Sequence, residues 1–254
     1  MMNKFIPDLD KKYKLNKIEK RRLNSELKLL KLKLEFSIHI AKKEKLSFHN
    51  AVIKCVGVRE LAEKKIKKEY KPIINYLKQI KLKEVNKARI NKIALELLIT
   101  SPLVKNIRKH KKETKCFRYE VYKNKSMMIH FKNAVVPKNP LKGKELENRK
   151  EELRKIAKEL KKKHPDVKKL WGSSWIRNIK IYSDLLPKEC KKNSKPEKKI
   201  KFYHGGYWGQ FYKYNGCLNK KRIKQFKQKW KFPLKNLTEQ CHIKYFYDMY
   251  LPKK

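Results

Sequence analysis

Residues 171–178 read W-G-S-S-W-I-R-N, and residues 203–212 read Y-H-G-G-Y-W-G-Q-F-Y. The stretch from Trp171 to Gly216, which contains both segments, holds five of the seven glycines and three of the four tryptophans. Glycine permits backbone conformations that other residues avoid, and aromatic side chains bury large apolar surfaces. This concentration predicts that the stretch forms either a ligand site or a tightly packed region.

The sequence before this stretch predicts a β-hairpin followed by a helix. Residues 116–122 alternate apolar and polar side chains, a polar turn follows, and residues 127–131 form the returning strand. Residues 133–141 contain two prolines and predict a loop. Between residues 146 and 160 the apolar side chains recur every three or four positions, which predicts an amphipathic helix.

The first part of the stretch predicts a strand, a turn and a short helix. Residues 167–170 predict a strand that leads into a W-G-S-S-W turn at residues 171–175. Residues 176–186 then predict a short helix that ends at a proline. The polar residues 188–197 predict a mobile linker.

The last third of the chain mixes aromatic and basic residues. Aromatic side chains at every second or third position of residues 200–214 predict a strand with glycines at bulges. Residues 220–231 predict a basic helix. Residues 242–251 predict either an aromatic strand or a docked helix, and the pattern does not separate the two.

Helical spacing dominates the first half of the chain. The apolar pattern predicts helices over residues 15–41, 47–66, 73–82, 85–99 and 101–110. A strand within residues 27–36 is a minor alternative, because the apolar residues there also partly alternate. The sequence therefore predicts an α/β (α+β) protein, with a helical region over residues 1–113 and a mixed-sheet α/β domain over residues 114–254.

The chain of 254 residues has a formal net charge of +47, with 71 Lys and Arg against 24 Asp and Glu. A basic surface binds phosphates through the release of counterions, so this charge indicates a nucleic-acid partner. However, the basic residues are spread evenly along the sequence, and few of them are Arg, which is preferred for bidentate phosphate and base contacts. A Lys-rich composition is also typical of an AT-rich genome, and the sequence leaves both explanations open.

The sequence predicts a cytoplasmic protein without a membrane-spanning segment. No apolar run reaches the roughly 18 residues that a transmembrane helix needs. The N-terminus also lacks the apolar core of a secretory signal. The five cysteines form no C-x-x-C pair, so we expect reduced thiols. They are Cys55, Cys116, Cys190, Cys217 and Cys241.

Two alternatives explain the polar residues of 171–178. Backbone N–H groups of a Ser173–Ser174 turn at a helix start suit an anion, and Arg177 would stand beside it. Trp175 and Asn178 would then contact the same substrate. Ordinary capping of the helix by one of the two serines explains the same sequence without a ligand.

Residues 203–211 combine an imidazole, an amide and aromatic rings. These groups suit a small-molecule pocket with a few convergent polar side chains. They equally suit a surface on which RNA bases stack, or the interior of a packed strand. The candidate residues are His204, Tyr207, Trp208 and Gln210.

His130, on the returning strand of the hairpin, is a candidate general base, and Asn133 in the next loop is a candidate substrate contact. A hydrogen-bonded structural histidine is the alternative for His130. The sequence contains no H-E-x-x-H, no Walker loop and no G-x-G-x-x-G, so it predicts no metal site and identifies no cofactor. If the protein is an enzyme, His130 and His204 are the predicted catalytic residues.

The chain resembles a family of uncharacterised bacterial proteins over about residues 95–254. The family pattern is S-P-L-V with a following His, then a G-S-W-L-x-N turn, an L-F-P motif and W-G-Q-F. The resemblance implies an architecture but no reaction, because the family has no established activity. The matching segments are S-P-L-V (101–104) with His110, I-H-F-K-N-A (129–134), P-K-N-P-L (137–141), H-P-D-V (164–167), W-G-S-S-W-I-R-N (171–178), L-L-P (185–187) and W-G-Q-F (208–211).

The order of hairpin, helix, strand, helix and strand is also similar to that of the GNAT-like acyltransferases. This resemblance implies that the strand ending at Phe131 faces an acyl-CoA and that residues 133–144 bind its pyrophosphate. The loop contains Pro137, Pro140 and the single Gly143, whereas that family uses a glycine-rich turn. A CoA ester is thus the cofactor that the resemblance implies, without a cofactor motif in the sequence.

Three functional hypotheses follow. The leading one is a small-molecule-binding enzyme domain, acyltransferase-like, whose ligand surface combines residues 129–134, 171–178 and 203–211. In it a histidine is the base, Arg177 and the serine turn hold an anion, and Asn178 and Gln210 orient the substrate. The second is a basic RNA- or ribosome-associated binding protein without catalysis, and the third is a structural or adaptor protein. The predicted partner is accordingly a small molecule or a nucleic acid, not a membrane, and the oligomeric state is not predicted.

Overall fold

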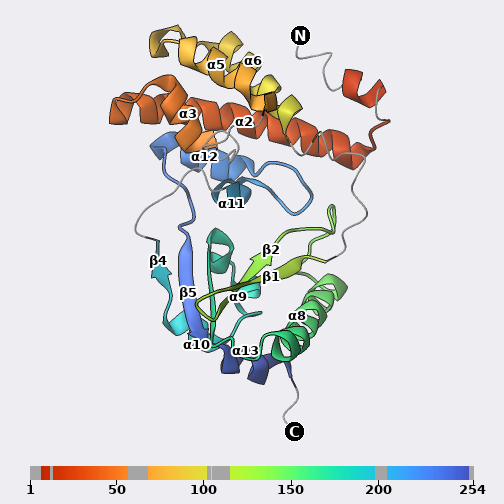
Figure 1. Cartoon of the computed structure of the whole chain (residues 1–254). Helices are drawn as coiled ribbons and strands as arrows, with labels where there is room; N and C mark the ends of the chain where they lie inside the picture. The colour runs from red at the N-terminus through yellow and green to blue at the C-terminus, as the bar shows by residue number, and fades with distance from the viewer. Residues whose placement is uncertain are drawn as a thin grey trace. The chain divides into compact units, whose positions relative to one another are not determined.

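The structure is a computed structural model that describes residues 7–11, 14–56, 68–101, 104, 115–197 and 205–251. The chain divides into two compact units (Figure 1). Unit 1 comprises Met1–Lys111 and Ile200–Lys231, and unit 2 comprises Lys112–Lys199 and Phe232–Lys254. Residues 200–231 thus group with the helical unit, whereas the sequence placed them with the α/β domain.

All the named elements of unit 1 are helical, and its described residues also contain an isolated β-bridge between Tyr212 and Leu218. Its elements confirm the helices that the sequence predicted over residues 15–41, 73–82, 85–99 and 220–231, and the described part of the helix over residues 47–66. Most of the helix predicted over residues 101–110 lies outside the described residues. The elements are α2 (Lys17–Glu44), α3 (Phe48–Val56), η1 (Lys68–Tyr70), α5 (Lys71–Gln79), η2 (Leu82–Glu84), α6 (Lys87–Thr100), α11 (Gly205–Trp208), η4 (Gly209–Phe211) and α12 (Lys220–Lys229).

Helix α2 is the centre of unit 1. It begins with a capping box, in which Asn16 accepts from the N–H groups of Ile18 and Glu19, and the Glu19 carboxylate accepts from the N–H of Asn16. One side of α2 packs on α3, α5 and α6 through a leucine row that includes Leu27 and Leu34. On another side, the ring of Phe36 contacts those of Trp208 in α11 and Phe226 in α12. Figure 1 shows α11 and α12 beside α2. Buried side chains on both sides make α2 the helix around which unit 1 packs.

The strand predicted over residues 200–214 is wrong for its described part, because residues 205–211 form α11 and η4. The aromatic residues Tyr207, Trp208 and Phe211 are separated by one, three and four positions. In a helix this spacing brings their side chains to one side, where all three are buried. The aromatic residues are so closely spaced that they match both the two-residue period of a strand and the 3.6-residue period of a helix. Packing against α2 favours the helix.

Unit 2 is built on a mixed five-stranded sheet with the order β1-β2-β3-β5-β4. The β1–β2, β3–β5 and β4–β5 pairs are antiparallel, and β2 and β3 are parallel. A parallel pair needs a crossover connection, and helix α8 lies in the chain between β2 and β3. The strands are β1 (Phe117–Tyr122), β2 (Ser126–Phe131), β3 (Lys169–Ser174), β4 (Lys195–Pro196) and β5 (Leu237–His242). The predicted α/β fold class, with a helical N-terminal region and a mixed sheet, is confirmed.

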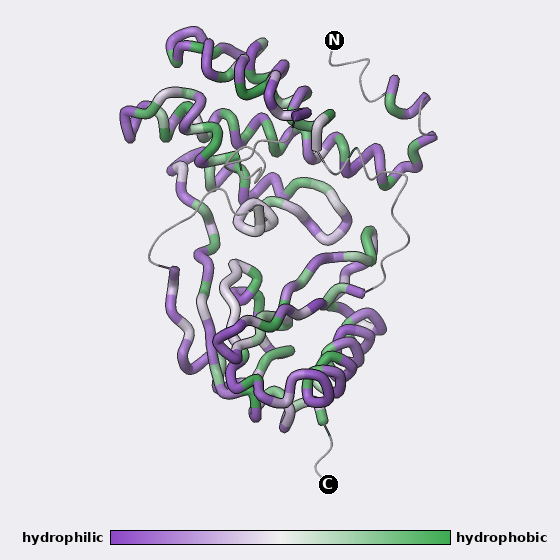
Figure 2. The backbone as a smooth tube through the Cα atoms, viewed as in Figure 1, coloured by the Kyte–Doolittle hydropathy of each residue, from purple (hydrophilic) through white to green (hydrophobic). Residues whose placement is uncertain are grey.

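The helices of unit 2 are α8 (Lys144–Lys163), η3 (Trp175–Asn178), α9 (Lys180–Ser183), α10 (Lys188–Lys192) and α13 (Ile243–Tyr250). Each of them places a side chain in or against one hydrophobic cluster that also contains Met127 of β2 and Leu170 of β3. All five helical elements therefore pack on one face of the sheet, which we call the core face. In Figure 2 most of α8 is purple, as expected for a helix that buries a single stripe.

Two local predictions for unit 2 are wrong. The segment 171–174 is not a turn but the second half of β3, which pairs with β5 along its whole length. Residues 188–197 are not a linker, because they form α10 and the edge strand β4. In both cases pairing with β5 determines the conformation. The sequence of β5 is mostly polar and by itself gives little indication of a strand. Residues 243–250, for which the sequence left a strand or a helix open, form α13.

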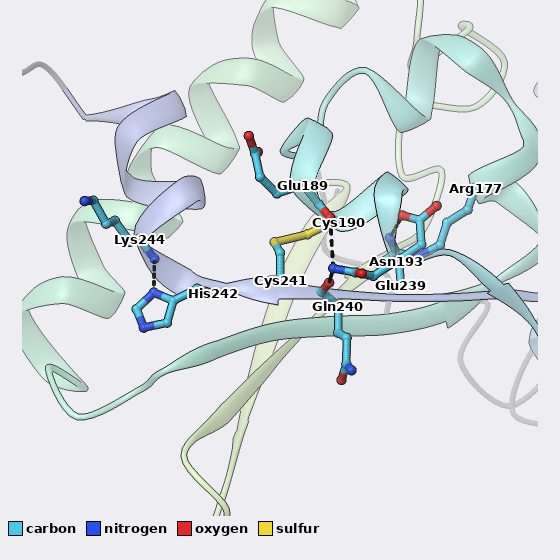
Figure 3. The surroundings of a disulfide bond; sticks show 9 residues. All are labelled: Arg177, Glu189, Cys190, Asn193, Glu239, Gln240, Cys241, His242 and Lys244. Carbon is cyan, nitrogen blue, oxygen red and sulfur yellow. Dashed lines mark hydrogen bonds and ion pairs between the residues drawn. A yellow bond between two sulfur atoms is a disulfide. The ribbon is translucent and has the colours of Figure 1, made fainter.

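The expectation of reduced thiols is wrong for one pair of cysteines. Cys190 of α10 and Cys241 of β5 form a disulfide across a sequence separation of 51 residues, and Figure 3 shows it between the helix and the strand. Both residues are buried, so the bond fastens α10 to the core face of β5. Cys55, Cys116 and Cys217 are free thiols, and burial raises the pKa of the Cys55 thiol to about 12.

Candidate functional site

The sheet of unit 2 has a second face, opposite the core face, which we call the open face. Alternation along each strand assigns residues to one face or the other, and strand register aligns them in rows across the sheet. The first row is Tyr122, Ser126, Lys169 and His242, and the second is Glu120, Met128, Trp171 and Gln240. The third row consists of two paired groups, Arg118 with His130 on β1 and β2, and Ser173, Thr238 and Lys195 on β3, β5 and β4. All of these residues except Ser126 are exposed or partly exposed.

Two aromatic rings meet on the open face. The rings of Tyr122 and Trp171 lie 5.8 Å apart, between centroids, with their planes at 53°. The Tyr122 hydroxyl contacts the Met128 sulfur at 4.0 Å and donates a hydrogen bond of 3.1 Å to Glu120. These contacts hold Tyr122, which is 37% exposed, against the sheet beside Trp171. The first two rows thus present an aromatic and thioether surface to solvent.

His130 lies in the third row and faces Glu120 of the neighbouring strand. Its Nε2 is 3.3 Å from a Glu120 carboxylate oxygen, within ion-pair distance but without hydrogen-bond geometry. The attraction therefore depends on protonation of the imidazole. The hydrogen bond from Tyr122 and the nearby His130 lower the pKa of the Glu120 carboxyl, so Glu120 carries a negative charge at neutral pH.

Exposed basic residues surround the open face. The hairpin turn contributes Lys123 and Lys125, and Lys132 follows β2. Lys168 precedes β3, and the open face itself carries Arg118, Lys169 and Lys195. Glu120 is the one acidic residue of the open face, and the other acidic side chain of the described strands, Glu239, points to the core face. The local charge is accordingly positive.

Arg177, predicted to hold an anion, is buried and forms an ion pair with Glu239 (Figure 3). Glu239 of β5 is the register partner of Gly172 in β3, and the guanidinium lies over this glycine. A Cβ atom on Gly172 would be 2.5 Å from Nη2 of Arg177, so the glycine makes room for the ion pair. In this arrangement the charge of Arg177 is balanced inside the core.

The other candidates of 171–178 have mostly local roles. Ser174 caps η3 by accepting from the N–H of Ile176, as the capping alternative expected, and Trp175 begins that helical turn with a partly exposed side chain. The Asn178 amide donates to the carbonyl oxygens of Trp175 and Lys235. Ser173 lies on the open face, where its Oγ accepts a hydrogen bond of 3.0 Å from Thr238. Of these candidates, the structure brings Ser173 to the same face as His130.

The loop after β2 is held by hydrogen bonds within the chain. Asn133 accepts from the N–H of Val135, and Asn139 accepts from the N–H of Leu141. The N–H of Ala134 points to the Cys116 sulfur at 3.4 Å. The acyltransferase resemblance implies that backbone N–H groups of residues 133–144 bind a pyrophosphate. Those of Ala134, Val135 and Leu141 already have partners within the chain.

Three candidates of 203–211 belong to unit 1, where they are buried. Tyr207 is 2%, Trp208 1% and Gln210 0% exposed. The Trp208 indole N–H donates to the carbonyl oxygen of Cys55, and the Gln210 amide donates to that of Tyr207. These side chains pack the interior of unit 1. His204 lies outside the described residues.

The sequence did not identify Tyr122, Met128 and Trp171 as members of one surface. The alternation of residues 117–122 and 126–131 contains that information, because it assigns Tyr122, Glu120, Met128 and His130 to the face opposite the apolar positions. Trp171 was assigned to a turn, so its place on a strand beside Met128 depended on knowledge of the β2–β3 pairing.

Searches of the whole chain against protein-family models, curated proteins and solved structures find no match. In the described ranges no group of three His, Cys, Asp or Glu side chains is arranged to hold a metal ion. No helix among the described residues combines the length and apolarity needed to cross a bilayer.

Proposed function

We propose that the protein binds RNA. The observation that carries this proposal is helix α12, which has the sequence K-K-R-I-K-Q-F-K-Q-K and contains six basic residues and no acidic one. Phe226 anchors the helix in the core of unit 1, and most of its lysines are exposed to solvent. A helix with one buried ring and a surrounding array of lysines is suited to follow a phosphate backbone.

Helix α8 in unit 2 also carries more basic than acidic residues. On α8, five glutamates are paired with basic residues of the same helix or of the preceding loop, as Glu147 is with Lys150 and Glu159 with Lys163. The remaining lysines of α8, among them Lys155, Lys158 and Lys162, are exposed. Since both units carry a surplus of exposed lysines, a polyanion gains favourable contacts with either of them.

The proposal predicts binding that weakens steeply with salt. Fluorescence anisotropy with a labelled RNA should show affinity falling by several orders of magnitude between about 50 and 200 mM salt. Replacing Lys220, Lys221, Lys224 and Lys229 together by Gln should weaken binding and reduce the salt slope by about one unit for each lysine that contacts a phosphate.

The matched control replaces the same four lysines by Arg, which keeps the charge and should preserve both affinity and slope. Affinity that is independent of salt, or a Gln variant that binds RNA as the wild type does, would contradict the proposal.

The alternative is the acyltransferase-like enzyme, and the observation that favours it is the His130–Glu120 pair on the open face. A carboxylate within ion-pair distance of an imidazole is a common setting of a general base. An acyl-CoA at about 100 times its dissociation constant should stabilise the protein by about 2.7 kcal/mol, which raises the melting temperature by a few degrees. Pantetheine, which lacks the nucleotide phosphates, is the control. An unchanged melting temperature with every acyl-CoA tested would count against this alternative.

A further inference from the structure

We infer that the open face of unit 2 is a stacking platform for the unpaired bases of a single strand, with Tyr122 and Trp171 as its base contacts. This inference rests on the proposed RNA binding and adds the site and the class of nucleic acid. It draws on unit 2, whereas the observation that carries the proposed function belongs to unit 1, so the two can fail separately.

The geometry of the two rings supports stacking. Tyr122 and Trp171 are neighbours at 5.8 Å on a surface where Met128 fills the space beside them. Tyr122 is exposed and Trp171 is partly exposed, so the pair leaves adjoining apolar area in water. A base that stacks on such a ring covers this area, and every base has a face suited to do so.

The polar residues of the open face complement a nucleotide chain. Lys169 lies next to Trp171 in the sheet, and Arg118 and Lys195 lie in the third row, so cations stand on more than one side of the rings. Ser173, Thr238 and Gln240 add hydroxyl and amide groups that can pair with base edges or sugars. The carboxylate of Glu120 repels phosphate, but it accepts a hydrogen bond from the Tyr122 hydroxyl. The cations Arg118, Lys169 and Lys195 outnumber it on the open face.

These features favour a single strand over a duplex. In a duplex the bases are stacked on one another and paired, so their faces are not available to protein rings. The surface of a sheet is also too broad to enter the deep, narrow major groove of an RNA helix. The chemistry that the open face recognises is therefore an unpaired nucleotide of RNA or of DNA.

The test compares aromatic variants on two kinds of probe. Wild type, Trp171→Ala, Tyr122→Ala and Trp171→Phe are titrated against a labelled oligouridylate of about ten nucleotides, the matching oligothymidylate, and an RNA duplex. Each Ala variant should bind the single strands roughly ten-fold or more weakly, with an unchanged salt slope because no charge is removed. Trp171→Phe retains a ring and should keep most of the affinity.

Tyr245→Ala is the control, because Tyr245 lies on α13 with 41% exposure and outside the open face.

The outcomes distinguish failure of the stacking platform from failure of RNA binding. If Trp171→Ala and Tyr122→Ala bind oligouridylate as the wild type does while the α12 Gln variant binds weakly, RNA binding stands and the stacking platform is refuted. Wild-type protein that binds neither single strand nor duplex refutes both. Preference for oligouridylate over oligothymidylate supports the platform and assigns a role to the 2′-hydroxyl, and equal binding supports it for unpaired strands in general.

Discussion

Replacing Glu239 by Ala is expected to destabilise unit 2 by about 3–5 kcal/mol, because it leaves the Arg177 guanidinium buried without a counter-charge. Both side chains of this pair are 2% exposed, so water cannot take the place of the lost carboxylate. Urea unfolding, monitored by circular dichroism, measures the decrease in the free energy of unfolding. Hydrogen exchange resolved by segment should show lower protection in β3, β5 and η3, and unchanged protection in α2 and α12.

Two further variants test the explanation. Glu147→Ala removes the acidic partner of an exposed pair on α8, in which Lys150 and Glu147 are 46% and 66% exposed, and should change the free energy of unfolding by less than about 1 kcal/mol. Replacing Arg177 by Met and Glu239 by Leu together removes both charges and should recover most of the stability lost in the single variant. A Glu239→Ala protein as stable as the Glu147→Ala control would mean that Arg177 is not confined as the structure places it.

The burial of Arg177 also shows where sequence reasoning about a site reaches its limit. An arginine beside a glycine and two serines is a reasonable anion-binding pattern when only residues 171–178 are considered. The residue that neutralises it is 62 positions away in sequence, on a strand whose composition gives little signal. Gly172, which lies in the predicted turn, has no side chain and so leaves room for the guanidinium over the paired strands β3 and β5.

The predictable parts of the fold are those determined by local periodicity. The helices α2, α5, α6, α8 and α12 each repeat apolar residues at three- and four-residue steps, and the β1–β2 hairpin alternates around a short polar turn. The parts that failed depend on distant partners. Strand β3 requires β5, strand β4 requires β5, and residues 205–211 become helical where their rings pack on α2.

The composition of 171–216 did indicate an unusual region, but several of the residues that drew attention to it are buried in two separate cores. Trp208 and Gln210 pack in unit 1, and Arg177 packs in unit 2. Within β3, Trp171 and Ser173 remain at the surface because they alternate with the buried residues Leu170 and Gly172. The concentration of glycine and tryptophan therefore indicated tightly packed segments. The alternation of buried and exposed residues along β3 indicated the exposed surface.

Replacing Trp208 by Ala is expected to destabilise unit 1 by about 3–5 kcal/mol, the usual cost of removing a large buried aromatic side chain. Trp208 is 1% exposed and its ring lies 5.6 Å from those of Phe211 and Phe226 and 5.9 Å from that of Phe36. The variant also leaves the carbonyl oxygen of Cys55 without the indole N–H. Urea unfolding should show a lower free energy of unfolding, and segment-resolved hydrogen exchange should show reduced amide protection in α2 and α12.

This result decides between the two roles that the W-G-Q-F segment can have. If Trp208 were a stacking or substrate contact, its replacement would reduce ligand binding and leave the free energy of unfolding nearly unchanged. If it is a core residue, stability falls, and Trp208→Phe recovers part of the loss by restoring a ring without the N–H donor. Tyr214→Ala, at a position that is 52% exposed, is the matched control and should stay within about 0.5 kcal/mol of the wild type. Because the rings around Trp208 belong to α2, η4 and α12, the same experiment shows whether residues 205–229 fold as part of the helical unit.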